Sequence, residues 1–477
     1  MKTDPKTLLQ GTLDQLGWGR YHRSLFVNCC FGTALIMVWP ILISIILLDL
    51  EQGTSMGSLL AVVYNVGAFS GCIWFSRMAA NIGRAYTFQR MILFSALGSL
   101  LLVFAPGIYY MLPCSLLLGL GNGGELVVTY TVFIENLPSI KKNLVNVINL
   151  MWALGGISVA AIALLLFFTG TGDFEIWRVT CLVFSLLCFV FAYFRTYVLE
   201  SPAFLYEHHE MRNLARVLRK LAKYNQKNEA LVKEFLRSLP SQYELATKQS
   251  VRKLMRPGLR HVTLKITVAG SISAFVFFGV VFFMPVWTIP DEKWMAFVLV
   301  ISMQASAIPG TYIGTLLLKC KLGVKKLHLV SNLAVGLLVL LFLISEQFYY
   351  QLALACFFYL LNTVNGTVLS TIVAESYPSQ VRAVGVGWET AVFRLAGGFA
   401  PVLFGPVYEK GGLSTCMVVL ACLLFLMGLF SLVLVENKPL KVRFSMPVSE
   451  IPPGLIQRAR TLNAQNMLHE IIPGELS

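Results

Sequence analysis

Long apolar runs recur twelve times along this chain of 477 residues, in two sets of six around a polar, basic stretch. Runs such as Ser24–Leu48 and Gln351–Ala374 are nearly uncharged. A helix needs about 20 apolar residues to cross the hydrocarbon core of a bilayer, where only helices and closed barrels satisfy every backbone group. Barrel strands alternate over about ten residues, so the runs are too continuous for a barrel. The sequence predicts an all-α membrane protein with twelve transmembrane helices in two six-helix bundles.

The runs also divide the chain into segments. We expect an N-terminal segment (1–24), a first six-helix bundle (25–198), a central loop (199–262), a second bundle (263–436) and a C-terminal tail (437–477). Amphipathic patterns predict helices at 208–224 and 228–237 in the central loop and near 455–468 in the tail. The expected spans are 25–48, 56–79, 87–105, 109–134, 144–168, 178–198, 263–287, 294–318, 327–345, 350–374, 383–408 and 414–435.

The net charge of +14 is unevenly placed. Lysines and arginines gather in alternate loops, which defines a basic side, and the loops of the other, acidic side carry Asp49, Glu51 and Glu346. Basic loops stay on the cytoplasmic side of a membrane, so both termini should face the cytoplasm, or the matrix in a mitochondrion. The same distribution argues against nucleic acid as a partner. The sequence does not indicate which membrane holds the chain.

Motifs for catalysis or cofactors are absent from the sequence. It contains no GxxxxGK[ST] loop and no nucleophile–base pairing in a polar segment. The ten cysteines nearly all lie in or beside apolar runs without CxxC spacing, so we expect no metal, no cofactor and no disulfide framework. An enzyme is therefore not expected.

Several short motifs stand at the ends of the spans. In chain order they are Leu16-Gly17-Trp18-Gly19-Arg20-Tyr21-His22, Gly121-Asn122-Gly123-Gly124, Phe133-Ile134-Glu135-Asn136-Leu137-Pro138, Glu200-Ser201-Pro202, Glu375-Ser376-Tyr377-Pro378 and Arg382-Ala383-Val384-Gly385-Val386-Gly387. Their order and spacing resemble the major facilitator superfamily, in particular the synaptic-vesicle-2-related and organic-ion transporters. The loop near Ile289–Lys293 is short, which resembles the compact branch without a large luminal domain.

This resemblance implies the major facilitator fold, with a substrate site between two halves that rock against each other. It also implies that opposite charges at the basic ends of the spans form a latch that breaks when that side opens. Plain interfacial charges are the alternative. The candidate latch residues are Gly83, Arg84, Glu135, Lys142, Glu200, Glu375 and Arg382.

The chain also departs from the family pattern. The loop after the second span keeps Gly83 and Arg84 but lacks the usual acid and final base, and the first span has no acid within Thr33–Leu47. A weaker latch is therefore expected, and a carboxylate that couples transport to protons must lie elsewhere or be missing. Two readings follow: a divergent transporter, or a transport-inactive scaffold or complex subunit with a protein partner.

Charged residues inside spans are costly and are candidates for function. Glu125 follows the glycines of the fourth span, and Glu389 and Arg394 lie in the eleventh. An inward-facing Arg394 would favour an anionic ligand, whereas inward-facing Glu125 or Glu389 would favour a cation or a proton. Pairing of Arg394 with an acid is the alternative.

Neutral side chains complete the candidate substrate site. They are Tyr64, Asn65, Gln304, Asn362 and Asn365. Each could instead bridge helices through hydrogen bonds. We therefore predict a secondary-active or facilitative transporter in the lipid bilayer that moves a small organic ion, with or without a coupling ion, by alternating access.

Overall fold

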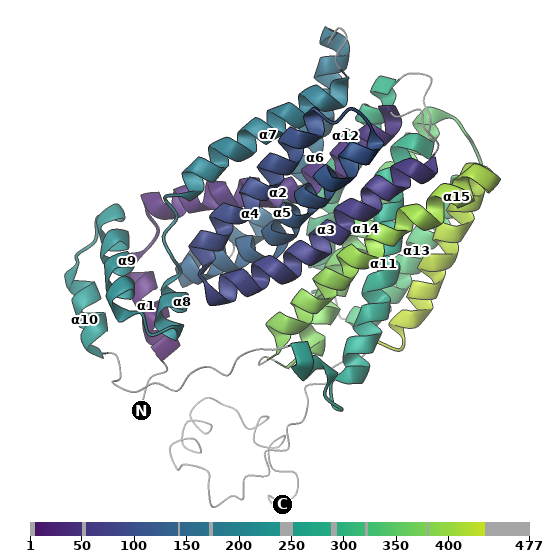
Figure 1. Ribbon diagram of the computed structural model, residues 1–477. Helices are drawn as coiled ribbons and strands as arrows, with labels where there is room; N and C mark the ends of the chain where they lie inside the picture. Colours follow the sequence, from purple (N-terminus) through teal and green to yellow (C-terminus); the bar gives the residue numbers. More distant parts are fainter. Residues whose placement is uncertain are drawn as a thin grey trace, which may run out of the picture. The chain divides into compact units, whose positions relative to one another are not determined.

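The computed structural model describes residues 5–49, 54–141, 144–170, 175–238, 251–287, 293–319, 323–378 and 381–434. All regular structure in these ranges is helical, and 11 helices are long and apolar enough to cross a membrane. The all-α fold that the apolar runs predict is therefore confirmed (Figure 1).

Six long helices form the first half of the membrane part and five the second. The first half contains α2 (Arg20–Asp49), α3 (Thr54–Asn81), α4 (Arg84–Val103), α5 (Ile108–Asn136), α6 (Leu144–Thr169) and α7 (Ile176–Arg195). The second contains α11 (Arg260–Trp287), α12 (Lys293–Leu317), α13 (Val324–Leu341), α14 (Phe348–Ser376) and α15 (Arg382–Ser431).

Helix α15 is 50 residues long, which is long enough to contain two of the twelve expected spans. Gly412 interrupts it with a left-handed φ of 67°, a conformation that glycine adopts without steric cost. This break lies between the expected spans 383–408 and 414–435. Thus α15 contains the last two spans, joined at Gly412.

Several helices begin before the expected hydrophobic boundary. Helix α2 starts at Arg20 rather than at residue 25, and the amide of Arg23 donates to the carbonyl of Gly19 over 3.2 Å. Backbone hydrogen bonding continues into the polar interface, where hydropathy no longer marks the helix.

Short helices gather at the basic end of the first half. These are α1 (Pro5–Leu16), η1 (Ser139–Lys141), α8 (Pro202–Glu207), α9 (Met211–Tyr224) and α10 (Ala230–Ser238), whereas η2 (Val251–Met255) contacts α11 and α15. The two amphipathic helices expected in the central loop correspond to α9 and α10. Helix α1 was not predicted, and the tail helix expected near 455–468 lies outside the described residues.

The first half depends on close contact between α3 and α5. A Cβ atom on Gly119 would lie 2.1 Å from the carbonyl oxygen of Tyr64, and one on Gly123 would lie 2.0 Å from that of Ala68. No side chain fits at such distances, so the glycines allow the two backbones to touch. These glycines therefore pack α5 directly against α3.

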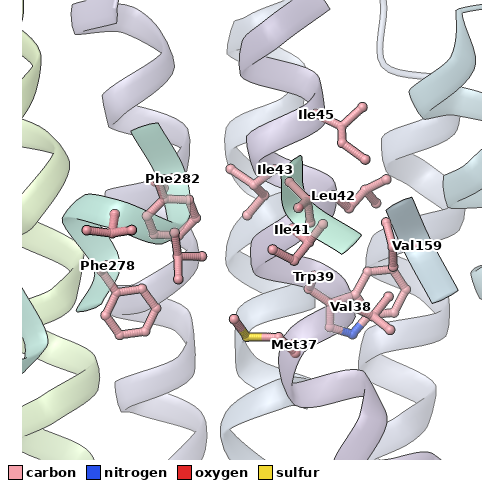
Figure 2. Packing of buried hydrophobic residues seen from close by; sticks show 14 of the residues in the cluster. Met37, Val38, Trp39, Ile41, Leu42, Ile43, Ile45, Val159, Phe278 and Phe282 are labelled. Carbon is pink, nitrogen blue, oxygen red and sulfur yellow. The ribbon is translucent and has the colours of Figure 1, made fainter. Parts of the chain in front are cut away.

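Within the described ranges, the buried apolar residues form three clusters, of which the largest contains residues of both halves. It includes Trp39 of α2, Val159 of α6, Phe282 of α11 and Phe297 of α12, and part of it is drawn in Figure 2. The hydroxyl of Ser44 also donates to the carbonyl of Phe282 over 3.2 Å. These contacts join the halves from the middle of the spans toward the acidic side.

The other two clusters lie toward the basic side, and each belongs to one half. The first-half cluster includes Phe88 and Val132 together with α1, α8, α9 and α10. The second-half cluster includes Val368 and Tyr377. The halves therefore share a core near the acidic side and have separate cores near the basic side.

Candidate functional site

Arg394 lies between the two halves, on α15. Its residue is only 6% exposed, and its guanidinium sits 5.4 Å from the centre of the Phe278 ring of α11. Tyr64 and Cys72 of α3 lie within electrostatic range of this charge. Among the described residues, no acid forms an ion pair with Arg394 and none accepts a hydrogen bond from it. Arg394 is therefore a cation inside the membrane part that has no counter-ion among the residues the structure describes.

Glu389 lies five residues before Arg394 on the same helix, about 500° of helical rotation away. Its side chain is partly buried and faces α11, where a Cβ on Gly270 would lie 3.4 Å from its Oε1 atom. Within the described parts of the chain, nothing pairs with this carboxylate or donates to it. A carboxylate in such a place can take up a proton or a cationic group.

Tyr64 and Asn65 are fully buried on α3. The hydroxyl of Tyr64 bonds to the side-chain amide of Asn122 on α5. Asn65 donates to the carbonyl of Ala61 over 2.9 Å, and its Oδ1 atom has no hydrogen-bond partner in the structure. A Cβ on Gly398 of α15 would lie 2.8 Å from the Cβ of Asn65. Both residues therefore lie near the contact of the two halves.

Gln304 of α12 lies where the second half meets the first. Its Nε2 atom donates to the hydroxyl of Tyr359 on α14 over 3.0 Å, and its Oε1 atom is buried and has no hydrogen-bond partner among the described residues. A Cβ on Gly156 of α6 would lie 2.7 Å from its Cδ atom. Gln304 thus presents an unused hydrogen-bond acceptor where α12 meets α6.

The two asparagines of α14 have different surroundings. Asn365 is buried and donates to Oδ1 of Asn332 over 3.2 Å, while Ser331 donates to it, so it bridges α14 to α13 inside the second half. Asn362 is only partly buried. Asn365 therefore bridges two helices through hydrogen bonds, which is the alternative role considered for it from the sequence.

Glu125 is fully buried but does not stand alone. Its Oε1 atom lies 2.6 Å from Nη1 of Arg195, at the end of α7, and its Oε2 atom accepts from the hydroxyl of Thr129 over 2.7 Å. Arg195 also donates to the carbonyl of Phe88 over 2.8 Å. The sequence reasoning missed Arg195, because it ends an apolar span and there resembles an ordinary interfacial charge. This pair links α5 to α7 within the first half.

Four of the candidate latch residues meet at the basic end of the first half. The guanidinium of Arg84 pairs with Glu135 over 3.1 Å. Glu200 accepts from the backbone amide of Arg84 over 2.8 Å and so caps the N-terminus of α4, where a carboxylate is favourable. Gly83 has a φ of 138°, and a Cβ there would lie 2.4 Å from Oε2 of Glu200. These contacts hold α4, α5 and the segment after α7 together within one half.

The remaining latch candidates lie elsewhere. Glu375, in the last turn of α14, and Arg382, the first residue of α15, are both exposed, and Lys142 lies outside the described residues. The junction between α14 and α15 is instead packed by Tyr377, because a Cβ on Gly385 would lie 2.2 Å from its ring.

Comparisons with known proteins agree with this architecture. The family model "Sugar (and other) transporter" matches residues 22–442. An uncharacterized MFS-type transporter of Schizosaccharomyces pombe is 24% identical, with 85% of each chain covered. The niacin transporter NiaP of Acinetobacter baylyi is 24% identical over 71% of this chain and 75% of its own length. Synaptic vesicle glycoprotein 2B of Homo sapiens is 28% identical over 41% of this chain and 30% of its own.

The fold also matches solved structures. The xylose transporter XylE from E. coli, in a partially occluded inward open conformation, superposes with a TM-score of 0.68 at 16% identity, covering 87% of this chain and 98% of XylE. Together with the family model, which spans nearly all of the described membrane part, this establishes the relationship. The chain belongs to the sugar (and other) transporter family of the major facilitator superfamily.

Proposed function

We propose that this transporter moves a small organic anion, most simply a monocarboxylate, by alternating access. The observation that carries the proposal is Arg394, a guanidinium 6% exposed between the halves with no counter-ion among the described residues. An unpaired charge inside a membrane costs several kcal/mol, so it is retained where a ligand neutralises it. A carboxylate matches the planar fork of arginine with two parallel hydrogen bonds.

Two further observations support the proposal. Two relatives are named as niacin transporters, one of them as a putative niacin and nicotinamide transporter, and niacin is a small monocarboxylic acid. Among the described residues, the buried cluster that contains both halves lies toward the acidic side, which is compatible with basic ends that separate during transport. The basic side would face the cytoplasm or the matrix, as the positive loops predict.

Uptake of radiolabelled nicotinate into proteoliposomes tests the proposal. We expect saturable uptake that unlabelled nicotinate and benzoate inhibit, while neutral nicotinamide and xylose do not, because only the anions pair with Arg394. Equal inhibition by the neutral compounds would refute the anion. Absence of saturable uptake for a panel of carboxylates would favour the transport-inactive scaffold instead.

Glu389 would carry the proton in this scheme, because it is a membrane-embedded carboxylate without a partner among the described residues. We expect an inward proton gradient to stimulate nicotinate uptake by the native protein. Glu389→Gln should remove that stimulation while leaving exchange of labelled for unlabelled nicotinate intact. The matched control is Glu346→Gln, at an exposed position in the loop before α14. Stimulation that survives in Glu389→Gln would exclude this role.

A further inference from the structure

A hollow on the surface of the central segment is lined almost entirely by cations. It measures about 370 Å³, and its lining residues are Arg212, Arg216, Arg219, Lys220, Lys223 and Glu229. The five cations all lie on α9, which Figure 1 shows beside α10 at the end of the first half. The hollow contains none of the residues of α3, α11 or α15 that form the candidate transport site.

The opposite face of α9 fixes the orientation of these cations. Leu214, Leu218 and Leu221 are fully buried in the first-half cluster with α1 and α8. Burial of these three leucines holds the helix in place, since removing large apolar side chains from water is strongly favourable. The helix therefore cannot turn its charged face inward, and the cations stay gathered around the hollow.

Among the described residues that line the hollow, one carboxylate, Glu229, faces five cations. In the part of the chain that the structure describes, none of the five cations forms an ion pair, and Arg216 instead donates to Oδ1 of Asn213 over 3.2 Å. Arg212 and Arg216, and likewise Arg219 and Lys223, stand four residues apart on one helix. Like charges at this spacing destabilise a helix. An anionic ligand would remove that cost.

We propose that this hollow binds a small polyphosphorylated anion. Arginine presents a planar fork that pairs with two phosphate oxygens at once, and three arginines with two lysines can engage several phosphates together. The volume falls within the range of about 300–1,000 Å³ that small-molecule sites occupy. The same chemistry is offered by a free polyphosphate and by the headgroup of a phosphorylated lipid in the adjacent leaflet.

The test uses the full chain in phosphatidylcholine nanodiscs. Inositol hexakisphosphate is titrated by calorimetry as the free probe. As the lipid probe, a few per cent phosphatidylinositol bisphosphate is included in the disc, and the thermal stability of the protein is compared with that in discs holding phosphatidylserine of equal total charge. Binding of the free probe, or stabilisation by the phosphoinositide beyond that by phosphatidylserine, supports the site and identifies its source.

Two triple variants with the same charge change decide where the ligand binds. Arg216→Gln, Arg219→Gln and Lys220→Gln together should weaken the response about tenfold or more, since charge-assisted hydrogen bonds are lost. Lys227→Gln, Lys233→Gln and Arg237→Gln change exposed cations that do not line the hollow and should alter the response less than about threefold, because they offer the ligand no direct charge-assisted hydrogen bonds. Equal losses in both variants would overturn the proposal. So would a native protein that does not bind the free probe and is stabilised equally by the two lipids.

Discussion

Arg394→Gln is expected to lower saturable nicotinate uptake about 100-fold, since truncating one partner of a buried charge pair costs about 2–5 kcal/mol of binding. The native guanidinium has no counter-ion among the described residues, so the loss should fall on ligand recognition rather than on folding. Glutamine keeps hydrogen bonding but removes the charge. Uptake and direct nicotinate binding are measured on the same purified preparation, whose monodispersity reports the fold.

Two further variants test whether the effect depends on the guanidinium of Arg394. Arg394→Lys keeps the charge but loses the bidentate fork, so it should retain a small fraction of uptake. Arg90→Gln removes one exposed cation at the basic end of α4 and should transport like the native protein. Removing an unpaired buried charge should also leave the thermal stability equal or higher. Full uptake by a well-folded Arg394→Gln protein would remove this residue from the substrate site.

Arg195→Leu is expected to cause a large loss of stability, unlike Arg394→Gln, which should lose transport but keep its stability. Glu125 would remain fully buried without its partner, and breaking a buried pair in this way costs about 3–5 kcal/mol of the free energy of unfolding. The loss should appear as a clear drop in the apparent melting temperature in detergent. Arg394→Gln, measured alongside, is the control for removing an arginine from a membrane helix.

The double variant separates the ion pair from simple packing. Combining Glu125→Leu with Arg195→Leu removes both charges, and replacing a buried pair by apolar residues is often neutral or stabilising. The double variant should therefore recover most of the stability that Arg195→Leu alone loses. A double variant as unstable as the single one would show that the unpaired carboxylate is not the cause.

The membrane fold was predictable because its signal is local. Twenty consecutive apolar residues specify a spanning helix whatever its neighbours are, and even the break at Gly412 falls between two such runs. The amphipathic period likewise marks α9. Helix α1 was not predicted because its sequence is largely polar. Its leucines Leu9 and Leu13 are buried through contact with segments that are distant in the sequence.

The candidate site was less predictable because it depends on which helices face each other. Hydropathy identifies Glu125 and Arg394 as unusual, yet not that Glu125 meets Arg195 across the bundle. The resemblance to the family marked Arg84, Glu135 and Glu200 as candidate latch residues. In the structure Arg84 contacts both acids. Their grouping within one half, however, follows from the packing of α4, α5 and α8, which no local pattern specifies.

In the alternating-access cycle proposed above, the apolar surface that the halves share near the acidic side has to separate in one of the steps. Opening the proposed substrate site toward the acidic side requires separation of the apolar contact between the halves, which includes Trp39 and Phe282. The cost is about 25 cal/mol for each Å² of apolar surface exposed to water. The contacts that form when the basic ends close must supply a comparable free energy. The proposed cycle therefore depends on the contacts that form between the basic ends, because these contacts must offset the cost of separating the halves near the acidic side.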